Sequence, residues 1–239
     1  MISHNNLIIR FFHQINLRLT NLKLLKFCVI SAPSIFIFGL FIGVVIAFFF
    51  GPESYNIWDN YISDLGSINY TPAPYFLDFS AMITAILLIP VFTHFVKLLF
   101  QKSEVKKDGL WKIFHFIMRI LIVIGYIFLL LSIIGLFGIG LFSEDRTTEL
   151  GLHLIFSFVV FGAFSFSAYF IGTVIILKKT SFFRVIGLFM ICTTPTFAIL
   201  FIINPENLTR PFIEWMMFLS ICVWLLLIDL IVYNKLKKK

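Results

Sequence analysis

Charged residues are scarce in this sequence. Asp, Glu, Lys and Arg make up 13% of the 239 residues, whereas soluble domains carry about 25%. Apolar residues make up 60% of the chain and gather in long uninterrupted runs. A water-soluble core could not bury so much apolar surface, so we predict that the solvent of this protein is the lipid bilayer.

Cysteine is also rare, and recognised catalytic motifs are missing. The three cysteines (Cys28, Cys192 and Cys222) form no CxxC pair, which argues against a zinc knuckle or a disulfide framework. The sequence contains no GxSxG, HExxH or Walker motif. The net charge of +7 is spread over short loops and a tail, so we expect no nucleic-acid partner. We predict no metal and no other cofactor.

Long apolar segments are what the chain has in abundance. A helix needs about 20 apolar residues to cross the hydrocarbon core. Six segments meet this requirement: about 27–50, 74–98, 114–142, 152–177, 183–203 and 211–233. Pro195, in the fifth segment, is expected to kink its helix. The sequence therefore predicts an all-α integral membrane protein, a bundle of six transmembrane helices.

The basic residues indicate how these spans cross the membrane. Of the 19 Lys and Arg residues, 17 precede span one, follow span six or lie at the 97–119 and 178–184 connections. Only Arg146 and Arg210 fall on the opposite side. Because cytoplasmic segments are enriched in Lys and Arg, we predict that both termini are cytoplasmic.

Three regions follow from this division. Residues 1–25 place apolar residues on one helical face and basic or polar residues on the other, which predicts an amphipathic helix on the cytoplasmic leaflet. A basic leader without defined structure is the alternative. The membrane domain covers 26–234, with a non-cytoplasmic loop at 51–73, and 235–239 form a basic cytoplasmic tail.

The polar stretch "DNYISDLGSINYTPAP", residues 59–74, stands out between apolar spans. Asp64 is expected to accept backbone N–H bonds in a turn that Gly66 closes. Pro72 and Pro74 should stiffen the return into span two. We predict that this loop forms a lid over the non-cytoplasmic end of the bundle. The alternative is an interfacial turn that serves only insertion and packing.

Ionisable residues inside spans are costly, so each invites a functional interpretation. Asp78, His153 and Glu214 all lie near the predicted non-cytoplasmic ends of their spans. They form either a structural polar group or a site for a lipid head group or an ion. Near the opposite membrane face, Asp229 and Arg119 are expected to form a structural pair or to reach separately toward the interface.

Three segments resemble one known family of six-span membrane proteins. "YISDLG" at 61–66 is similar to the PYISDTG-like motif of the damage-regulated autophagy modulators, with Leu65 as the departure. Residues 131–162 resemble the family's glycine-rich end of span three, its acidic loop and a His at the start of span four. Residues 214–229 resemble its last span, which begins with Glu-Trp and ends near an Asp.

This family groups the autophagy modulators with the FGF-receptor-activating protein, a GPI-anchor remodelling factor, and the fungal suppressor-of-four-kinase protein. A related group of uncharacterised prokaryotic six-span proteins shares the Ser-x-Leu-Gly turn, and Leu65 agrees with that group. The resemblance implies a role in lipid or GPI-anchor handling, autophagy or membrane lipid organisation. Matching positions carry over as candidate site residues: Ser63, Asp64, Gly66, His153, Glu214 and Trp215.

Three functions remain open at this point. The first is a membrane protein that binds or organises membrane lipid without catalysis. The second is a lipid-modifying enzyme acting at the non-cytoplasmic face, with acid–base chemistry by Asp64, Asp78, His153 and Glu214. The third is a small transporter, although internal repeats are not evident. Membrane lipids are the expected partners, and the missing nucleophile favours the first function.

Overall fold

The computed structural model describes residues 19–101 and 109–238. Within these residues the chain contains α-helices and short 3-10 turns but no strand. Six helical segments are long and apolar enough to cross a membrane, which confirms the predicted six-helix bundle and an integral membrane protein. Most of the predicted amphipathic helix at 1–25 lies outside the described residues, and its last four residues begin the first span.

The helices begin and end close to the predicted boundaries. Their bounds are α2 Leu22–Phe50, α3 Tyr75–Phe100, α4 Gly109–Leu141, α5 Leu152–Leu177, α6 Arg184–Cys192, α7 Thr194–Ile203 and α8 Arg210–Lys237. Two 3-10 turns, η1 Ser63–Gly66 and η2 Glu144–Arg146, lie in the connecting loops. Polar side chains start two of the spans. Asn21 accepts hydrogen bonds from the first turn of α2, and Thr209 accepts one from the first turn of α8.

The fifth span is broken in two. Thr193 separates α6 from α7, with φ −103° and ψ −68°. Pro195 has no N–H to donate to the preceding turn, so the helix breaks where the sequence predicted a kink. The Thr194 hydroxyl at the break is buried and lies 2.9 Å from the Ser220 hydroxyl, while the Trp224 indole N–H donates to it. These bonds join the broken span to α8.

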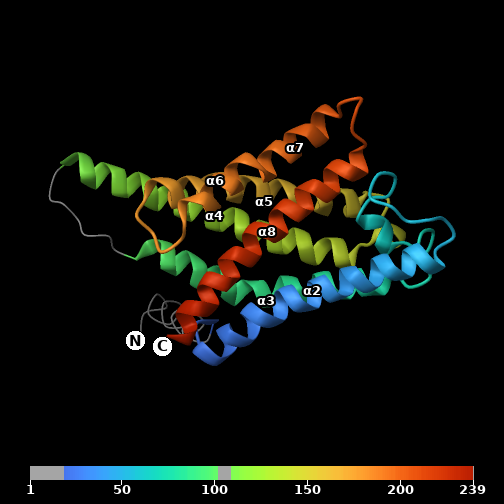
Figure 1. Ribbon diagram of the computed structural model, residues 1–239, viewed down its shortest axis with the longest axis horizontal. Helices are drawn as coiled ribbons and strands as arrows, with labels where there is room; N and C mark the ends of the chain where they lie inside the picture. The colour runs from blue at the N-terminus through green and yellow to red at the C-terminus, as the bar shows by residue number, and fades with distance from the viewer. Residues whose placement is uncertain (1–18, 102–108, 239) are drawn as a thin grey trace, which may run out of the picture.

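The spans are arranged in an elongated bundle, with α8 crossing the others obliquely (Figure 1). Each span packs against the next along the chain, and α8 returns to α2, which closes a ring of six. The extent of packing differs around the ring. The α4–α5 and α2–α3 pairs pack closely, and at Gly39 an added Cβ would lie 2.4 Å from Ser80 of α3. The α2–α8 pair packs lightly.

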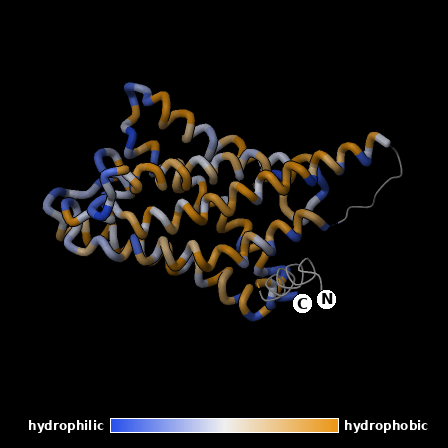
Figure 2. Tube along the Cα trace, turned by 180° about the vertical axis from the view of Figure 1, so that it is seen from behind, coloured by the Kyte–Doolittle hydropathy of each residue, from blue (hydrophilic) through white to orange (hydrophobic). Residues whose placement is uncertain are grey.

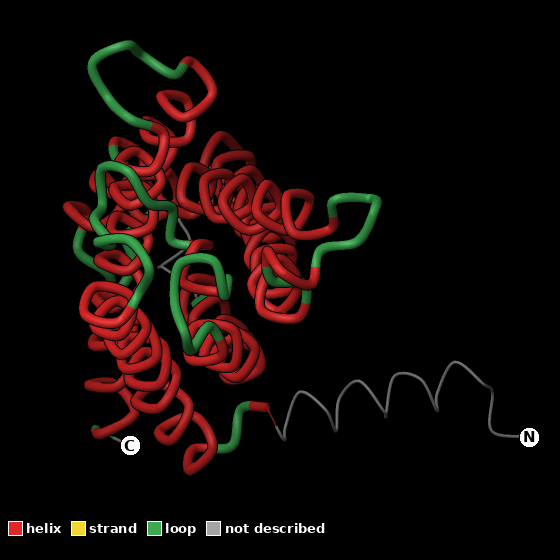
Figure 3. Tube along the Cα trace, turned by 90° about the vertical axis from the view of Figure 1, so that its right-hand side faces the viewer, coloured by secondary structure: helices red, strands yellow, loops and turns green. Residues whose placement is uncertain are grey.

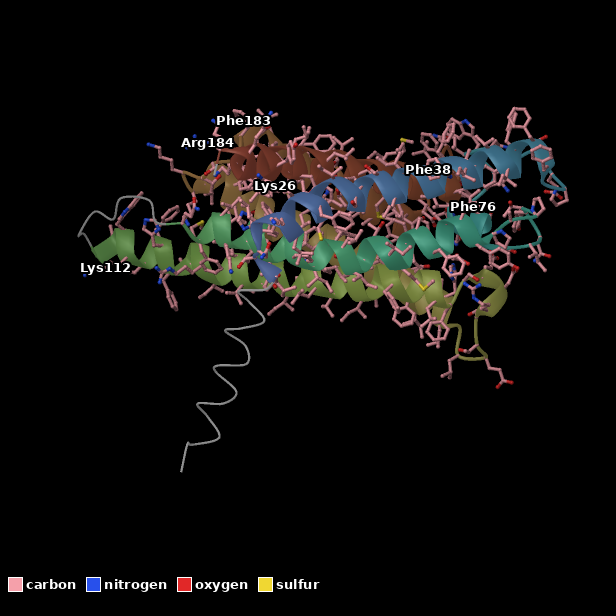
Figure 4. The ribbon with its side chains drawn as sticks, turned by 90° about the horizontal axis from the view of Figure 1, so that it is seen from below. Lys26, Phe38, Phe76, Lys112, Phe183 and Arg184 are labelled. Carbon is pink, nitrogen blue, oxygen red and sulfur yellow. The ribbon has the colours of Figure 1, made fainter. Side chains whose placement is uncertain are left out.

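Hydrophobic residues cover the sides of the bundle, and hydrophilic residues gather at its ends (Figure 2). Phe38, Phe41 and Phe79 are each more than half exposed on these sides, as expected for contact with lipid. We call the end formed by residues 51–74, 142–151 and 204–209 the loop end. The opposite end is the basic end, and Lys26, Lys112 and Arg184 lie toward it (Figure 4).

Candidate functional site

The loop that follows α2 is held together by Asp64. The Asp64 carboxylate accepts the Tyr61 backbone N–H at 2.9 Å and the Asn60 side-chain amide at 3.5 Å. Its side chain is only 4% exposed. Burial raises the pKa of Asp64 to about 6, and the Tyr61 hydrogen bond opposes part of that rise. Asp64 therefore caps its own turn, which confirms the expectation from the sequence.

The same loop is fastened to the start of α8. The Glu214 carboxyl accepts the Ile62 backbone N–H at 3.1 Å, and the Trp215 indole N–H donates to the Asn60 carbonyl at 3.1 Å. Trp58 stacks on Phe212 with ring centroids 4.1 Å apart. Glu214 thus lies beneath the loop, as predicted. The loop and its neighbours occupy the face seen end-on in Figure 3.

Asp78, near the start of α3, has an ion-pair partner that the sequence did not suggest. The Arg146 guanidinium donates to the Asp78 carboxylate at 2.7 Å and to the Gly140 carbonyl at 2.9 Å. Gly66 approaches from the loop, and a Cβ added there would lie 2.8 Å from Asp78 Oδ1. A side chain at position 66 would therefore displace either the Asp78 carboxylate or the loop that lies over it.

Asp145 joins the two large loops of the loop end by hydrogen bonds. The Asp145 carboxylate accepts the Ser67 hydroxyl at 2.7 Å and the Ile68 backbone N–H at 2.6 Å. Asp145 and Arg146 belong to η2, so one short turn supplies partners to both the loop and α3. Sequence reasoning missed these two residues. One signal was available, because Arg146 is one of only two basic residues expected on the side that holds the buried Asp78.

His153 completes the polar group at the loop end. Its Nδ1 lies 2.8 Å from the Phe142 carbonyl, and its ring is half-buried at the start of α5. His153 lines the same cavity as Ser63, Asp78 and Glu214. The structure therefore brings together six of the seven residues singled out from the sequence around one end of that cavity, while Trp215 packs behind them against Tyr55 and Phe218.

The cavity has a volume of about 120 Å³ and runs through the middle of the bundle. Its walls come from α2, α3, α4, α5 and α8, and Ile62 and Ser63 of the loop form its roof. Glu214 and Asp229 mark its two ends. At 1.5 Å per helical residue, these two acids lie roughly 22 Å apart along α8. Apolar residues dominate the walls between them, including Phe36, Ala81, Leu88, Leu136, Phe161, Phe164 and Phe218.

Asp229, at the far end of the cavity, differs from the other acids. It is 5% exposed, and its Oδ1 has no hydrogen-bond partner among the described residues. Arg119 is exposed on α4, and the one ion pair in the described part of the chain joins Arg146 to Asp78. The pairing of Asp229 with Arg119, one of the two structural arrangements expected from the sequence, is wrong.

The polar side chains around the cavity can perform only limited chemistry. Across residues 19–101 and 109–238, no three His, Cys, Asp or Glu side chains lie close enough to hold a metal ion. Asp64, Asp78 and Glu214 each accept hydrogen bonds from the protein itself. What the arrangement offers is an apolar space within the bundle with a polar roof. No protein-family model, curated protein or solved structure matches the chain.

Proposed function

We propose that this integral membrane protein binds membrane lipid in its central cavity and does so without catalysis. The observation that carries the proposal is the cavity itself, which is long, narrow and walled by apolar side chains inside a ring of transmembrane helices. A space with such walls accepts part of a hydrocarbon chain, because the apolar side chains between its two ends need no hydrogen-bond partners. The resemblance to the autophagy-modulator and GPI-anchor-remodelling family supports the same role.

The hydrogen bonds at the loop end favour binding over an enzymatic role. A general acid or base needs an ionisable group that can reach the substrate. Here the Glu214 carboxyl binds the Ile62 N–H, the Asp78 carboxylate binds Arg146, and His153 Nδ1 contacts a backbone carbonyl. Glu214 holds the roof at Ile62, while the other two contacts join α3 and α5 to the 142–151 loop. These contacts support the structural interpretation of the polar group over a head-group or ion site.

The broken fifth span gives little support to transport. Substrate sites of transporters commonly lie at interrupted helices. In this protein none of the residues that line the cavity comes from α6 or α7, and the hydroxyl at the break is bonded to α8. The break is therefore accounted for by packing within the bundle.

The proposed orientation puts the basic end in the cytoplasm and the loop end outside it, because cytoplasmic segments are rich in Lys and Arg. Single cysteines at Asn69, exposed at the loop end, and at Ser181, exposed at the basic end, test this in a background without native cysteines. An impermeant thiol reagent applied to intact cells should label the first and spare the second. The reverse pattern would overturn the orientation.

A photoactivatable lipid analogue tests lipid binding. Ala81 on α3 and Cys222 on α8 both line the cavity, so Ala81→Phe and Cys222→Phe each fill it from a different helix. Both variants should reduce crosslinking to cavity peptides. Phe79→Trp is the matched control, because Phe79 is 58% exposed on the outer side of α3. Undiminished crosslinking in both folded filling variants would contradict lipid binding in the cavity.

A further inference from the structure

Asp229 is a buried carboxyl group whose partner is missing from the described chain. Asp229 lines the cavity at the end that faces the basic end of the bundle, and it is only 5% exposed. Its Oδ1 accepts no hydrogen bond from the described residues. An acid in a hydrocarbon environment is costly when no donor or cation accompanies it. Ionisable residues inside the membrane generally mark a binding or transfer site for this reason.

The acids at the loop end show that the fold supplies donors where an acid serves the structure. Asp64 and Glu214 each accept a backbone N–H from the loop, and Asp78 accepts from Arg146. Asp229 lies on α8 among packed helices, whose backbone N–H groups are used within each helix. Because neither a backbone N–H nor a described side chain serves Asp229 Oδ1, a molecule in the cavity is well placed to supply the donor.

The cavity is adjacent to an opening on the side of the bundle. A groove between α2 and α8 is lined by Pro33, Ser34, Ile37, Phe38, Phe41 and Leu226. Three of these residues, Pro33, Ile37 and Leu226, also line the cavity. The groove runs along the seam where the ring of helices is lightly packed. Phe38 marks this side of α2 in Figure 4.

The position of this seam limits what can pass through it. Ile37, Phe38 and Phe41 are 47%, 64% and 64% exposed and lie near the middle of α2, which places the groove in the hydrocarbon region of a bilayer that α2 spans. Leu226 lies three residues before Asp229, which is about one helical turn. A hydrocarbon chain can thus extend from the seam into the cavity while its head lies at Asp229.

We propose that Asp229 binds the amine head of a single-chain lipid whose hydrocarbon chain occupies the cavity and the α2–α8 seam. This inference rests on the proposed lipid binding and names the class of ligand. An ammonium group supplies both hydrogen bonds and a compensating charge to the buried acid. An alcohol supplies a hydrogen bond alone. A fatty acid brings a second carboxyl next to Asp229, so like charges disfavour it.

The test uses three photoactivatable probes of equal chain length: a long-chain amine, the matching alcohol and the matching fatty acid. Each is crosslinked at neutral pH to the purified full-length protein, and labelled peptides are quantified. We expect crosslinking to decrease from amine to alcohol to acid. Asp229→Asn should lower amine labelling by about tenfold, the loss expected for one hydrogen bond to a charged group.

Asp59→Asn is the control, because Asp59 is an exposed acid of the loop and its removal changes the net charge by the same amount. It should leave amine labelling unchanged. Equal labelling of the cavity by all three probes, in the wild type and in Asp229→Asn, would overturn the amine site and leave lipid binding intact. Absence of cavity labelling by every probe would overturn the lipid binding on which the amine site rests. If Asp229→Asn does not fold, the order of the probes on the wild type decides.

Discussion

Two buried acids on one helix have opposite surroundings. Glu214 lies at the loop end of α8 and accepts the Ile62 N–H. Asp229 lies 15 residues further along the same helix and lines the same cavity, with Oδ1 unbonded within the described chain. Both are less than a tenth exposed. Burial alone therefore does not distinguish an acid that supports the fold from one that is available to a ligand.

The difference follows from where free backbone donors are found. Residues in an irregular loop have N–H groups without a helical partner, and a nearby carboxylate can satisfy them. The loop over the bundle supplies such groups at Tyr61 and Ile62. Helices in a membrane satisfy their own N–H groups internally. An acid in the middle of packed helices has no backbone donor, unless a side chain or a ligand brings one.

The largest effect should follow removal of the acid beneath the loop. Glu214→Ala leaves the buried Ile62 N–H without an acceptor, which costs about 2–3 kcal/mol. For a chain of this size the midpoint of thermal unfolding should fall by roughly 5–10 °C in detergent. Glu206→Ala removes an exposed acid from the preceding loop and should change little. Equal midpoints for the two variants would show that Glu214 does not hold the loop.

The Asp78–Arg146 pair should come next. Arg146→Gln leaves Asp78 buried without its cation, and because Arg146 is 43% exposed, we expect a loss of about 1–2 kcal/mol rather than the full cost of a buried charge. Adding Asp78→Asn should restore part of that loss, since no charge is then stranded. Arg210→Gln, at the start of α8, is the control. Strict additivity in the double variant would mean that the pair is not coupled.

Asp64 should make stability depend on pH. Its pKa is raised from 3.8 to about 6 by burial, so the folded state binds more protons than the unfolded state between these values. Its contribution is therefore fully present below pH 4 and is lost as pH rises through 6. The free energies of unfolding measured near pH 4 and pH 7.5 should differ more for the wild type than for Asp64→Asn, by about 1–2 kcal/mol. The same difference in both proteins would rule out titration of Asp64.

The six spans could be predicted closely from the sequence because length and apolar content are properties of each segment alone. The placement of Glu214 beneath the loop could also be predicted, since the order of the spans puts Glu214 and the loop on the same side of the membrane. The sequence placed Arg146 on the same side as Asp78, but the contact between them could not be predicted, because it depends on how η2 folds back onto α3. The cavity and the lack of a partner for Asp229 could not be predicted either, because both depend on which helices close the ring.

The most direct test of the contrast between the two acids is a pair of matched substitutions on α8. Glu214→Leu and Asp229→Leu each replace a buried acid with an apolar side chain of similar size, and their unfolding midpoints are measured in the same detergent without added lipid. We predict that Glu214→Leu lowers the midpoint, while Asp229→Leu raises it by a few degrees, because an unsatisfied buried polar group costs about 1–3 kcal/mol. A fall for Asp229→Leu as large as that for Glu214→Leu would contradict the account, since it would mean that Asp229, too, holds the fold together.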